Sequence, residues 1–457
     1  MEKSHRNILI VLLALLAAVF AFNRWAFRET APTPVKVFLG PIAESEENAN
    51  DVFRLLEMDW EDYYPSMLIE SAAYAPNTNR RDRILRILEG GTGESFGDDR
   101  TQWQRWLWSK EPNLHPDYAE FKALLYEPFD PSFREYFHKQ RVSTIRLDEV
   151  LFSRMRRDGM IPPLTRPKHI TAPQSDALPD EELVVGIEIN GKPRAYPKRM
   201  LEYHEVVLDE LGGESVMGTF CGFSGMIAFY ESTIDGVTYK FGTSGFIYRS
   251  NKLLYDHATK SLWQSLSGLP VIGPMAGVST RLKPLPVVIT PWKTWLDAHP
   301  DTTLLSPETG FGKYYSQPTV FENYGKVEEL AFPVPKLDSR LAVKAEVLAI
   351  RAIDPNAQQL AIAREFLQSK AVHHGESGGQ QYLVVTDPGG ASRVYESGAT
   401  QFESFDGKTA IDTNKGAWKM TESALVGPDG TKLRRYPAHR VYWHSWSAAF
   451  PDTQLVK

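Results

Sequence analysis

The sequence predicts an α+β fold, in which a helical N-terminal region precedes a β-rich module of two related, duplicated lobes. Residues 44–70 are acidic and carry apolar side chains at helical spacing. From about Val184 onward, short β-prone runs alternate with turn dipeptides. Residues 282–304 align without a gap with residues 433–455. The first two observations give the fold class, and the third gives the duplication.

Composition and missing motifs exclude several classes of function. The chain has 457 residues, of which 42% are apolar, and this length corresponds to about three domains. A net charge of −6 argues against a broad nucleic-acid-binding surface. A single cysteine excludes an intramolecular disulfide, a CxxC redox pair and a multi-cysteine zinc site. Because phosphate-loop, dinucleotide-binding and HExxH motifs are also missing, ATPase, dinucleotide oxidoreductase and zinc-protease functions have no support.

The N-terminal residues predict export of the chain. Lys3 and Arg6 precede an uninterrupted apolar run over residues 8–22, which Arg24 follows. This order is typical of a signal anchor or a signal peptide, and we interpret residues 1–28 as an uncleaved transmembrane anchor. Cleavage of the segment and a buried helix are the alternatives. We expect a bacterial envelope protein, anchored in the inner membrane, with its main body periplasmic or otherwise extracytoplasmic.

Residues 40–145 are predicted to form a helical domain. Arginines and apolar residues interleave over 80–88, and Gly90-Gly91 is a natural helix stop. Asp98 and Asp99 begin a further helix that carries Trp103 and its neighbouring tryptophans, which we interpret as packing residues. The acidic and basic runs of this region are typical of solvated helix faces.

Two β-rich lobes are predicted to follow, over residues 146–310 and 311–457. Asn190-Gly191 and Asp235-Gly236 favour two-residue hairpin turns, because a type I′ turn needs positive φ at both central residues. Both dipeptides are structural signals and carry no functional information.

The internal repeat is anchored by tryptophans and by one tripeptide. The aligned pairs are Trp292 with Trp443, Trp295 with Trp446, and Pro300-Asp301-Thr302 with Pro451-Asp452-Thr453. We interpret the match as a duplication of the whole lobe. A recurrent cap, in which a short tryptophan-bearing helix is followed by Asp-Thr and a strand, is the alternative.

The densest group of chemically capable residues lies between Arg194 and Gln264, in the first lobe. A short helix over residues 198–203 is predicted to present His204-Glu205. Cys221 ends a β-prone run and begins a loop punctuated by glycines, whose N–H groups suit an anion or a carbonyl oxygen.

This part of the sequence resembles the bacterial domain of unknown function family 3179, from about residue 147 to the C-terminus. The motifs that carry the resemblance are Arg157-Asp158-Gly159, Ile161-Pro162-Pro163, Arg194-Ala-Tyr-Pro197, His204-Glu205, Thr219-Phe-Cys221, Phe241-Gly-Thr-Ser-Gly245, Tyr255-Asp256, Ser261-Leu-Trp263 and the ending from Trp446 to Thr453. The family usually carries a second cysteine where this chain has Ser224. The chain therefore departs from the CxxC pattern of the family. The resemblance implies a shared fold and an envelope setting, and it implies no activity.

These residues are compatible with three functions. Only one of the three is enzymatic, so the sequence does not decide whether the chain is an enzyme. In a Cys-dependent acyl transferase or hydrolase, Cys221 is the nucleophile and His204 the base, while Glu205 or Asp256 orients the imidazole. In a metal-binding protein, Cys221, His204 and His257 hold copper(I) or zinc.

The third function, which we favour, is a module that binds a small ligand or an envelope protein in a groove between the lobes. An aromatic and glycine-rich groove with a few polar groups is typical of small-molecule sites. The predicted ligand-binding residues are Tyr196, Ser224, Ser244, Ser261, Trp263 and Gln264. A structural role for Cys221, as a small buried residue at a strand end, fits this third function.

Overall fold

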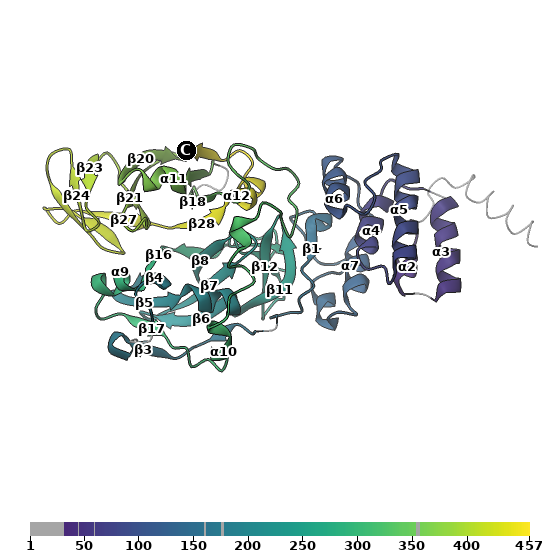
Figure 1. Ribbon diagram of the computed structural model, residues 1–457, viewed down its shortest axis with the longest axis horizontal. Helices are drawn as coiled ribbons and strands as arrows, with labels where there is room; N and C mark the ends of the chain where they lie inside the picture. The colour runs from purple at the N-terminus through teal and green to yellow at the C-terminus, as the bar shows by residue number, and fades with distance from the viewer. Residues whose placement is uncertain (1–31, 44, 59, 160, 175–177, 353–356) are drawn as a thin grey trace, which may run out of the picture. The chain divides into compact units, whose positions relative to one another are not determined.

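The computed structural model describes residues 32–43, 45–58, 60–159, 161–174, 178–352 and 357–457 (Figure 1). The predicted membrane anchor, residues 1–28, lies outside these ranges. Within them, no helix has the length and apolar character needed to cross a membrane. The chain divides into two compact units, residues 1–94 with 113–121, and residues 95–112 with 122–457.

The first unit is helical, as predicted. Its longest helix, α5 (Thr78–Thr92), begins at Asn77, whose side chain accepts a hydrogen bond from the Arg80 N–H at 3.0 Å. The helix runs through the predicted stop at Gly90-Gly91 and ends at Gly93, where φ is +75°. Gly91 instead packs against Trp60, since an added Cβ would lie 2.2 Å from the ring. The other elements are η1 (Val35–Leu39), α2 (Gly40–Ala43), α3 (Glu46–Met58) and α4 (Tyr64–Ala72).

The second unit includes helical residues that the sequence grouped with the first. Helix α6 (Arg100–Ser109) begins at Asp99, which accepts from the Gln102 N–H at 2.9 Å. Helix α7 (Tyr118–Tyr126) crosses the division between the units. After it, Phe133 and Phe137 pack edge-to-face against Phe246 of the β-rich body, with ring centroids 4.9 Å apart in each pair. These aromatic contacts explain why residues 122–145 group with the strands.

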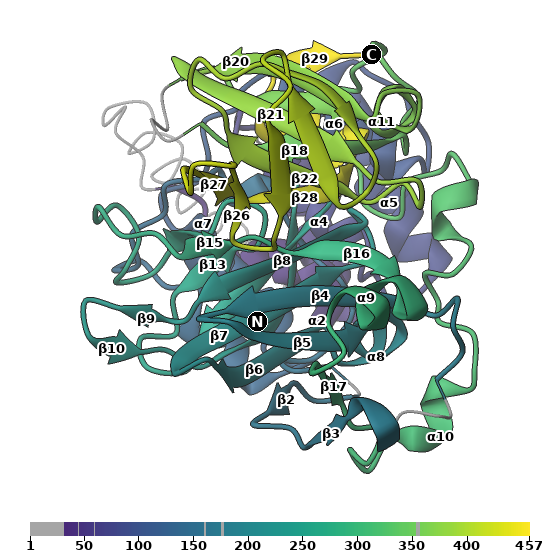
Figure 2. The same cartoon turned by 90° about the vertical axis from the view of Figure 1, so that its left-hand side faces the viewer.

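Three five-stranded sheets form the first part of the β-rich body (Figure 2). The first has the order β16-β4-β5-β17-β3, with β4 Leu183–Ile189, β5 Lys192–Pro197, β16 Val288–Pro291, β17 Thr303–Leu305 and β3 His169–Thr171. The second has the order β15-β8-β7-β6-β2, with β6 Val206–Leu211, β7 Glu214–Cys221, β8 Met226–Glu231, β15 Lys283–Leu285 and β2 Leu164–Thr165. The third has the order β1-β11-β12-β13-β14, with β1 Val150–Phe152, β11 Phe241–Tyr248, β12 Asn251–Asp256, β13 Leu262–Gln264 and β14 Leu269–Ile272.

Both predicted hairpin turns are confirmed. Asn190 and Gly191 join β4 to β5 with φ of +51° and +71°. Asp235 and Gly236, with φ of +48° and +78°, join β9 (Thr233–Ile234) to β10 (Val237–Thr238). The short helix α8 (Lys198–His204) follows β5, as the sequence predicts.

Two further sheets form the C-terminal part. One has the order β28-β18-β19-β29, with β18 Glu346–Ile350, β19 Leu360–Ala363, β28 Ala438–Tyr442 and β29 Gln454–Val456. The other has the order β20-β21-β22-β27-β26-β25-β24-β23, with β20 Val372–Ser377, β21 Gln380–Thr386, β22 Ser392–Glu396, β23 Phe402–Phe405, β24 Thr409–Asp412, β25 Ala417–Met420, β26 Ala424–Val426 and β27 Lys432–Tyr436.

The strands β16-β4-β5-β17 and the strands β28-β18-β19-β29 follow the same pattern of antiparallel and parallel pairing. In each, the first three strands are antiparallel and the last is parallel to its neighbour. Helix α9 (Trp292–Ala298) follows β16, and α12 (Trp443–Ala449) follows β28. The Trp295 Nε1–H donates to Thr302 Oγ1 at 2.9 Å, and the Trp446 Nε1–H donates to Thr453 Oγ1 at the same distance.

One hydrophobic core joins the two parts of the β-rich body. Met217, Tyr230 and Trp263 come from the first part, and they cluster with Trp443 and Trp446 of the second. All of these side chains are at most 2% exposed. Packing therefore fills the space between the two parts at this place.

A buried ionic cluster also lies between the two parts. Glu422 accepts from Arg393 Nε at 2.8 Å and from Arg435 Nη1 at 2.9 Å, and Arg435 Nη2 donates to the Val287 carbonyl oxygen at 3.2 Å. Although burial opposes ionisation, the charge of Arg393 holds the pKa of Glu422 well below its usual range.

Candidate functional site

Cys221 is fully buried at the end of β7. Its exposed fraction is 0%, and its strand partner is Met226. Phe321 covers the following loop so closely that a Cβ on Gly222 would lie 2.2 Å from the ring. Burial raises the pKa of the nearby Tyr324. The loop that follows the buried thiol is thus covered by aromatic side chains.

His204, the predicted base, is buried at the end of α8 with both ring nitrogens engaged. Nδ1 lies 2.7 Å from the Pro162 carbonyl oxygen, to which it donates, and Nε2 lies 2.6 Å from the Tyr315 hydroxyl. Burial lowers the pKa of His204, so the ring is neutral at pH 7. The His204 ring is therefore a neutral imidazole with a partner on each nitrogen, and it contributes to the packing around Tyr315.

The two predicted orienting carboxylates also have other partners. Glu205 forms an ion pair with the buried Lys252 of β12. Asp256 accepts from the Thr259 hydroxyl at 2.6 Å, from the Ser261 N–H at 3.2 Å and from the Trp263 Nε1–H at 3.0 Å. The structure does not bring His204 and Asp256 together, and Asp256 instead closes the turn from β12 to β13.

Most of the predicted ligand-binding residues form internal hydrogen bonds. The Tyr196 hydroxyl donates to Asp209 at 2.7 Å, and the Ser244 hydroxyl donates to the Leu253 carbonyl oxygen at 2.6 Å. Ser224 accepts from Asn251 Nδ2 at 3.0 Å. Ser261 and Trp263 belong to the Asp256 turn described above.

The residues proposed for a metal do not cluster. His257 stacks on Tyr255 with ring centroids 4.9 Å apart, and burial lowers its pKa. Among the described residues, no group of three or more His, Cys, Asp and Glu side chains is placed to hold a metal ion.

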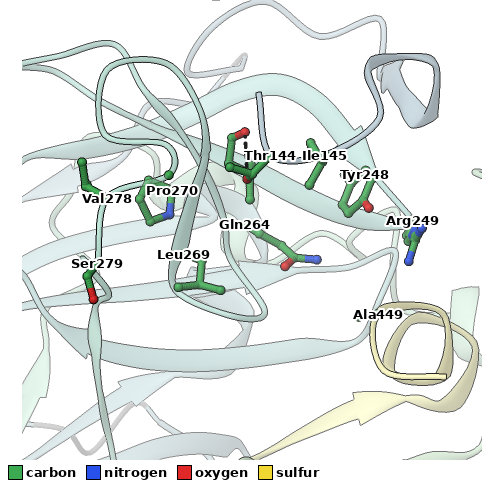
Figure 3. A pocket seen from close by; sticks show the side chains of 12 residues that line it. Thr144, Ile145, Tyr248, Arg249, Gln264, Leu269, Pro270, Val278, Ser279 and Ala449 are labelled. Atoms are coloured by element: carbon green, nitrogen blue, oxygen red, sulfur yellow. Dashed lines mark hydrogen bonds between the residues drawn. The ribbon is translucent and has the colours of Figure 1, made fainter. Parts of the chain in front are cut away.

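Gln264, the sixth predicted ligand-binding residue, lines a cavity of about 440 Å³ at the end of β13 (Figure 3). We call it the Gln264 cavity. Its other lining residues are Thr144, Ile145, Tyr248, Arg249, Leu269, Pro270, Val271, Gly277, Val278, Ser279 and Ala449. The volume is in the range of small-molecule sites, and the walls combine apolar side chains with a few polar groups.

Two polar side chains of the cavity have no hydrogen-bond partner among the described residues. The side chain of Gln264 is only 8% exposed, and its amide points into the space that Figure 3 shows. Tyr248 is 7% exposed, and burial raises its pKa to about 12. Its hydroxyl therefore stays protonated at neutral pH. Gln264 and Tyr248 are therefore neutral, nearly buried side chains whose hydrogen-bonding capacity the other described residues do not satisfy.

The cation of the cavity is already neutralised. Arg249 Nε donates to Glu149 Oε2 at 2.5 Å, and Nη2 donates to Oε1 at 3.2 Å. Its Nη1 donates to the Ala448 carbonyl oxygen at 2.9 Å. The charge of Arg249 is thus committed to Glu149.

Sequence reasoning missed Tyr248 and Arg249. They occupy the end of β11 and the turn to β12, where Arg249 and Ser250 both have positive φ. An Arg-Ser turn has no sequence signature comparable to Asn-Gly, so neither residue stood out. The run of β-prone residues before the turn was the only available signal.

Comparison with known proteins gave one match. A family model described as a protein of unknown function, DUF3179, matches residues 157–453. Comparison with curated proteins and with solved structures gave no match. Because the match covers most of the chain and includes both parts of the β-rich body, the chain belongs to the DUF3179 family.

Proposed function

We propose that the protein binds a small, uncharged ligand in the Gln264 cavity. The observation that carries this proposal is the amide of Gln264, which is nearly buried, has no partner among the described residues and lines a cavity of about 440 Å³. Because this amide faces the cavity, a ligand that pairs with it gains the net free energy of a neutral hydrogen bond, about 0.5–1.5 kcal/mol.

The chemistry of the walls favours a neutral ligand with hydrogen-bonding groups. The Gln264 amide both donates and accepts, and the protonated Tyr248 hydroxyl adds a second donor. Since Glu149 neutralises Arg249, the cavity offers no free charge. Apolar contacts come from Ile145 and Leu269 on opposite segments of the lining. Amides and polyols are the chemical classes that fit these groups.

The cysteine-dependent and metal-binding alternatives have less support. Cys221 is fully buried, and the predicted base His204 already has two partners. A nucleophile must reach its substrate, and its base must reach the thiol. The binding function requires neither condition.

A thermal-shift screen with uncharged amide and hydroxyl fragments tests this function. We expect hits that raise the melting temperature of wild type and of Cys221→Ser equally, and that lose their effect in Gln264→Leu. Leucine keeps a similar side-chain volume and removes both hydrogen-bonding groups. Hits that act equally on Gln264→Leu, or that require the Cys221 thiol, would contradict the proposal.

We also propose that residues 1–28 anchor the protein in the inner membrane, with the β-rich body on the outer side. The support is the apolar run over residues 8–22 after Lys3 and Arg6. Full-length protein is expected in the membrane fraction, and a chain that starts at residue 31 in the soluble fraction. Equal partition of the two chains would refute the anchor.

A third proposal is that residues 146–310 and 311–457 arose by duplication of one domain. The equal order of β15-β8-β7-β6 and β27-β22-β21-β20 supports it. So does a shared hydrogen bond, from Trp263 Nε1 to Asp256 at 3.0 Å and from Trp418 Nε1 to Asp412 at 2.7 Å. An experimental structure in which the two sets of strands fail to superpose would contradict it.

A further inference from the structure

Two arginines from different parts of the β-rich body meet at the turn that joins β13 to β14. Arg351, which follows β18, donates from Nη1 to the Ser267 carbonyl oxygen. Arg281 precedes Leu282, whose N–H donates to the Gly268 carbonyl oxygen at 2.9 Å. The turn thus binds the side chain of Arg351 and the backbone of the residue that follows Arg281. We call these two arginines the arginine pair.

The arginine pair has no carboxylate partner among the described residues. Three other cations of the β-rich body do have such a partner: Lys283 pairs with Glu231, Arg364 with Glu346 and Arg434 with Glu396. Glu396 lies near Arg351, beside the same small hollow, but it accepts from Arg434 Nε at 3.1 Å and from Nη2 at 2.5 Å.

The guanidinium groups are also short of hydrogen bonds. The Nε atoms of Arg281 and Arg351 are buried and have no hydrogen-bond partner in the described part of the chain. Burial, together with repulsion from Arg281, lowers the pKa of Arg351 to about 10. The hydroxyl groups nearby do not compensate, because Tyr230 donates to the Ser265 carbonyl oxygen at 2.7 Å and Tyr436 donates to the Arg351 carbonyl oxygen.

Two half-buried guanidinium groups without an anion are the arrangement that recognises a compact oxyanion. The Nε and Nη2 edge of each group forms two parallel hydrogen bonds to an oxyanion, and this geometry is bidentate for phosphate and carboxylate. Two positive charges at one place match the double charge of a phosphate monoester better than the single charge of a carboxylate. A bound phosphate would also provide a partner for both buried Nε atoms.

We propose that the arginine pair binds the phosphate group of a ligand. This site goes beyond the proposed function, because neither arginine lines the Gln264 cavity. The arginine pair binds an anionic group, whereas the Gln264 cavity binds a neutral ligand. It also joins the two parts of the body, since Arg281 comes from the first and Arg351 from the second, so binding is expected to stabilise their contact.

Calorimetric titration of the full-length protein with inorganic phosphate, at constant ionic strength set with sodium chloride, tests the site. Arg281→Gln is the first variant, because the Arg281 side chain forms no hydrogen bond within the described residues and its loss removes no such contact from the fold. We expect its affinity for phosphate to be roughly tenfold lower or more, as the loss of a charge-assisted bidentate contact implies. Arg351→Gln is expected to act in the same way, provided that it folds.

Arg434→Gln is the matched control, because this exposed arginine lies two residues before Tyr436, which contacts Arg351, and already has Glu396 as its partner. It is expected to bind phosphate as wild type does, and so is Gln264→Leu. Equal affinity of wild type and Arg281→Gln, or no heat from phosphate at all, would overturn the proposal. Binding of succinate without binding of phosphate would overturn the ligand class, and loss of phosphate binding in Gln264→Leu would overturn the separation of the two sites.

Discussion

The reactivity of Cys221 depends on burial, because its exposed fraction is 0% and aromatic side chains cover its loop. We therefore expect native protein to react slowly with iodoacetamide between pH 6 and pH 8, and unfolded protein to react at the rate of a free thiol. His204→Ala should leave the native rate unchanged, since His204 bonds to Pro162 and Tyr315. Fast alkylation below pH 7 that His204→Ala abolishes would contradict this account and favour a catalytic pair.

His444 is expected to make stability depend on pH. It is 1% exposed, and burial lowers its pKa to about 4. The Nδ1 atom lies 3.0 Å from the Val343 carbonyl oxygen, and Nε2 lies 3.1 Å from the Ser250 hydroxyl. The folded state keeps this ring neutral while the unfolded chain protonates it near pH 6.5, so its contribution is full above that pH and is lost as pH falls toward 4.

Denaturant unfolding of wild type and of His444→Gln, measured from pH 7 to pH 4, checks this expectation. Glutamine does not titrate and keeps an amide donor. The difference in unfolding free energy between the two proteins should shrink by roughly 2–3 kcal/mol over this range. A difference that stays constant with pH would show that His444 is not held neutral by the fold.

At the scale of elements, the β4–β5 hairpin depends on one glycine. Gly191 has φ of +71° and open space around its Cα. An added Cβ would contact no neighbouring atom, and its cost would come only from the left-handed backbone conformation. Gly191→Ala is expected to lower the unfolding free energy by about 1 kcal/mol. Gly90→Ala is the matched control, because Gly90 also has open space but lies inside α5, where alanine is expected to stabilise by up to about 1 kcal/mol. Equal effects of the two substitutions would contradict the turn assignment.

Local elements were well predicted from the sequence because their signals are local. Asn190-Gly191 defined its hairpin, and Asp99 defined the start of α6, since turn and cap preferences act over a few residues. The end of α5 was missed by two residues, because packing of Gly91 against Trp60 continues the helix past the glycine signal.

The candidate site was predicted less well, because residue type does not show which partners a side chain meets. Gln264 was singled out and lines the cavity, while Asp256 was singled out and closes a turn. Both are polar residues at strand ends in the same stretch of sequence. The cavity around Gln264 also needs Thr144 and Ala449, which are distant in the sequence, and no local pattern encodes these contacts.

At the scale of the molecule, the two parts of the β-rich body are expected to fold together. Trp443 and Trp446 pack in one core with Trp263, and Arg435 reaches the Val287 carbonyl oxygen across the ionic cluster. A fragment of residues 311–457 would expose these side chains to water. We expect it to show no cooperative unfolding transition by near-ultraviolet circular dichroism, and a cooperative transition of the isolated fragment would contradict a shared core.

The most direct test of the central claim is the dissociation constant of one uncharged amide fragment for wild type and for Gln264→Leu, measured by calorimetry. The account predicts weaker binding to Gln264→Leu, by up to about tenfold for one lost neutral hydrogen bond, with Cys221→Ser equal to wild type. Equal dissociation constants for wild type and Gln264→Leu would show that the ligand does not lie in the Gln264 cavity.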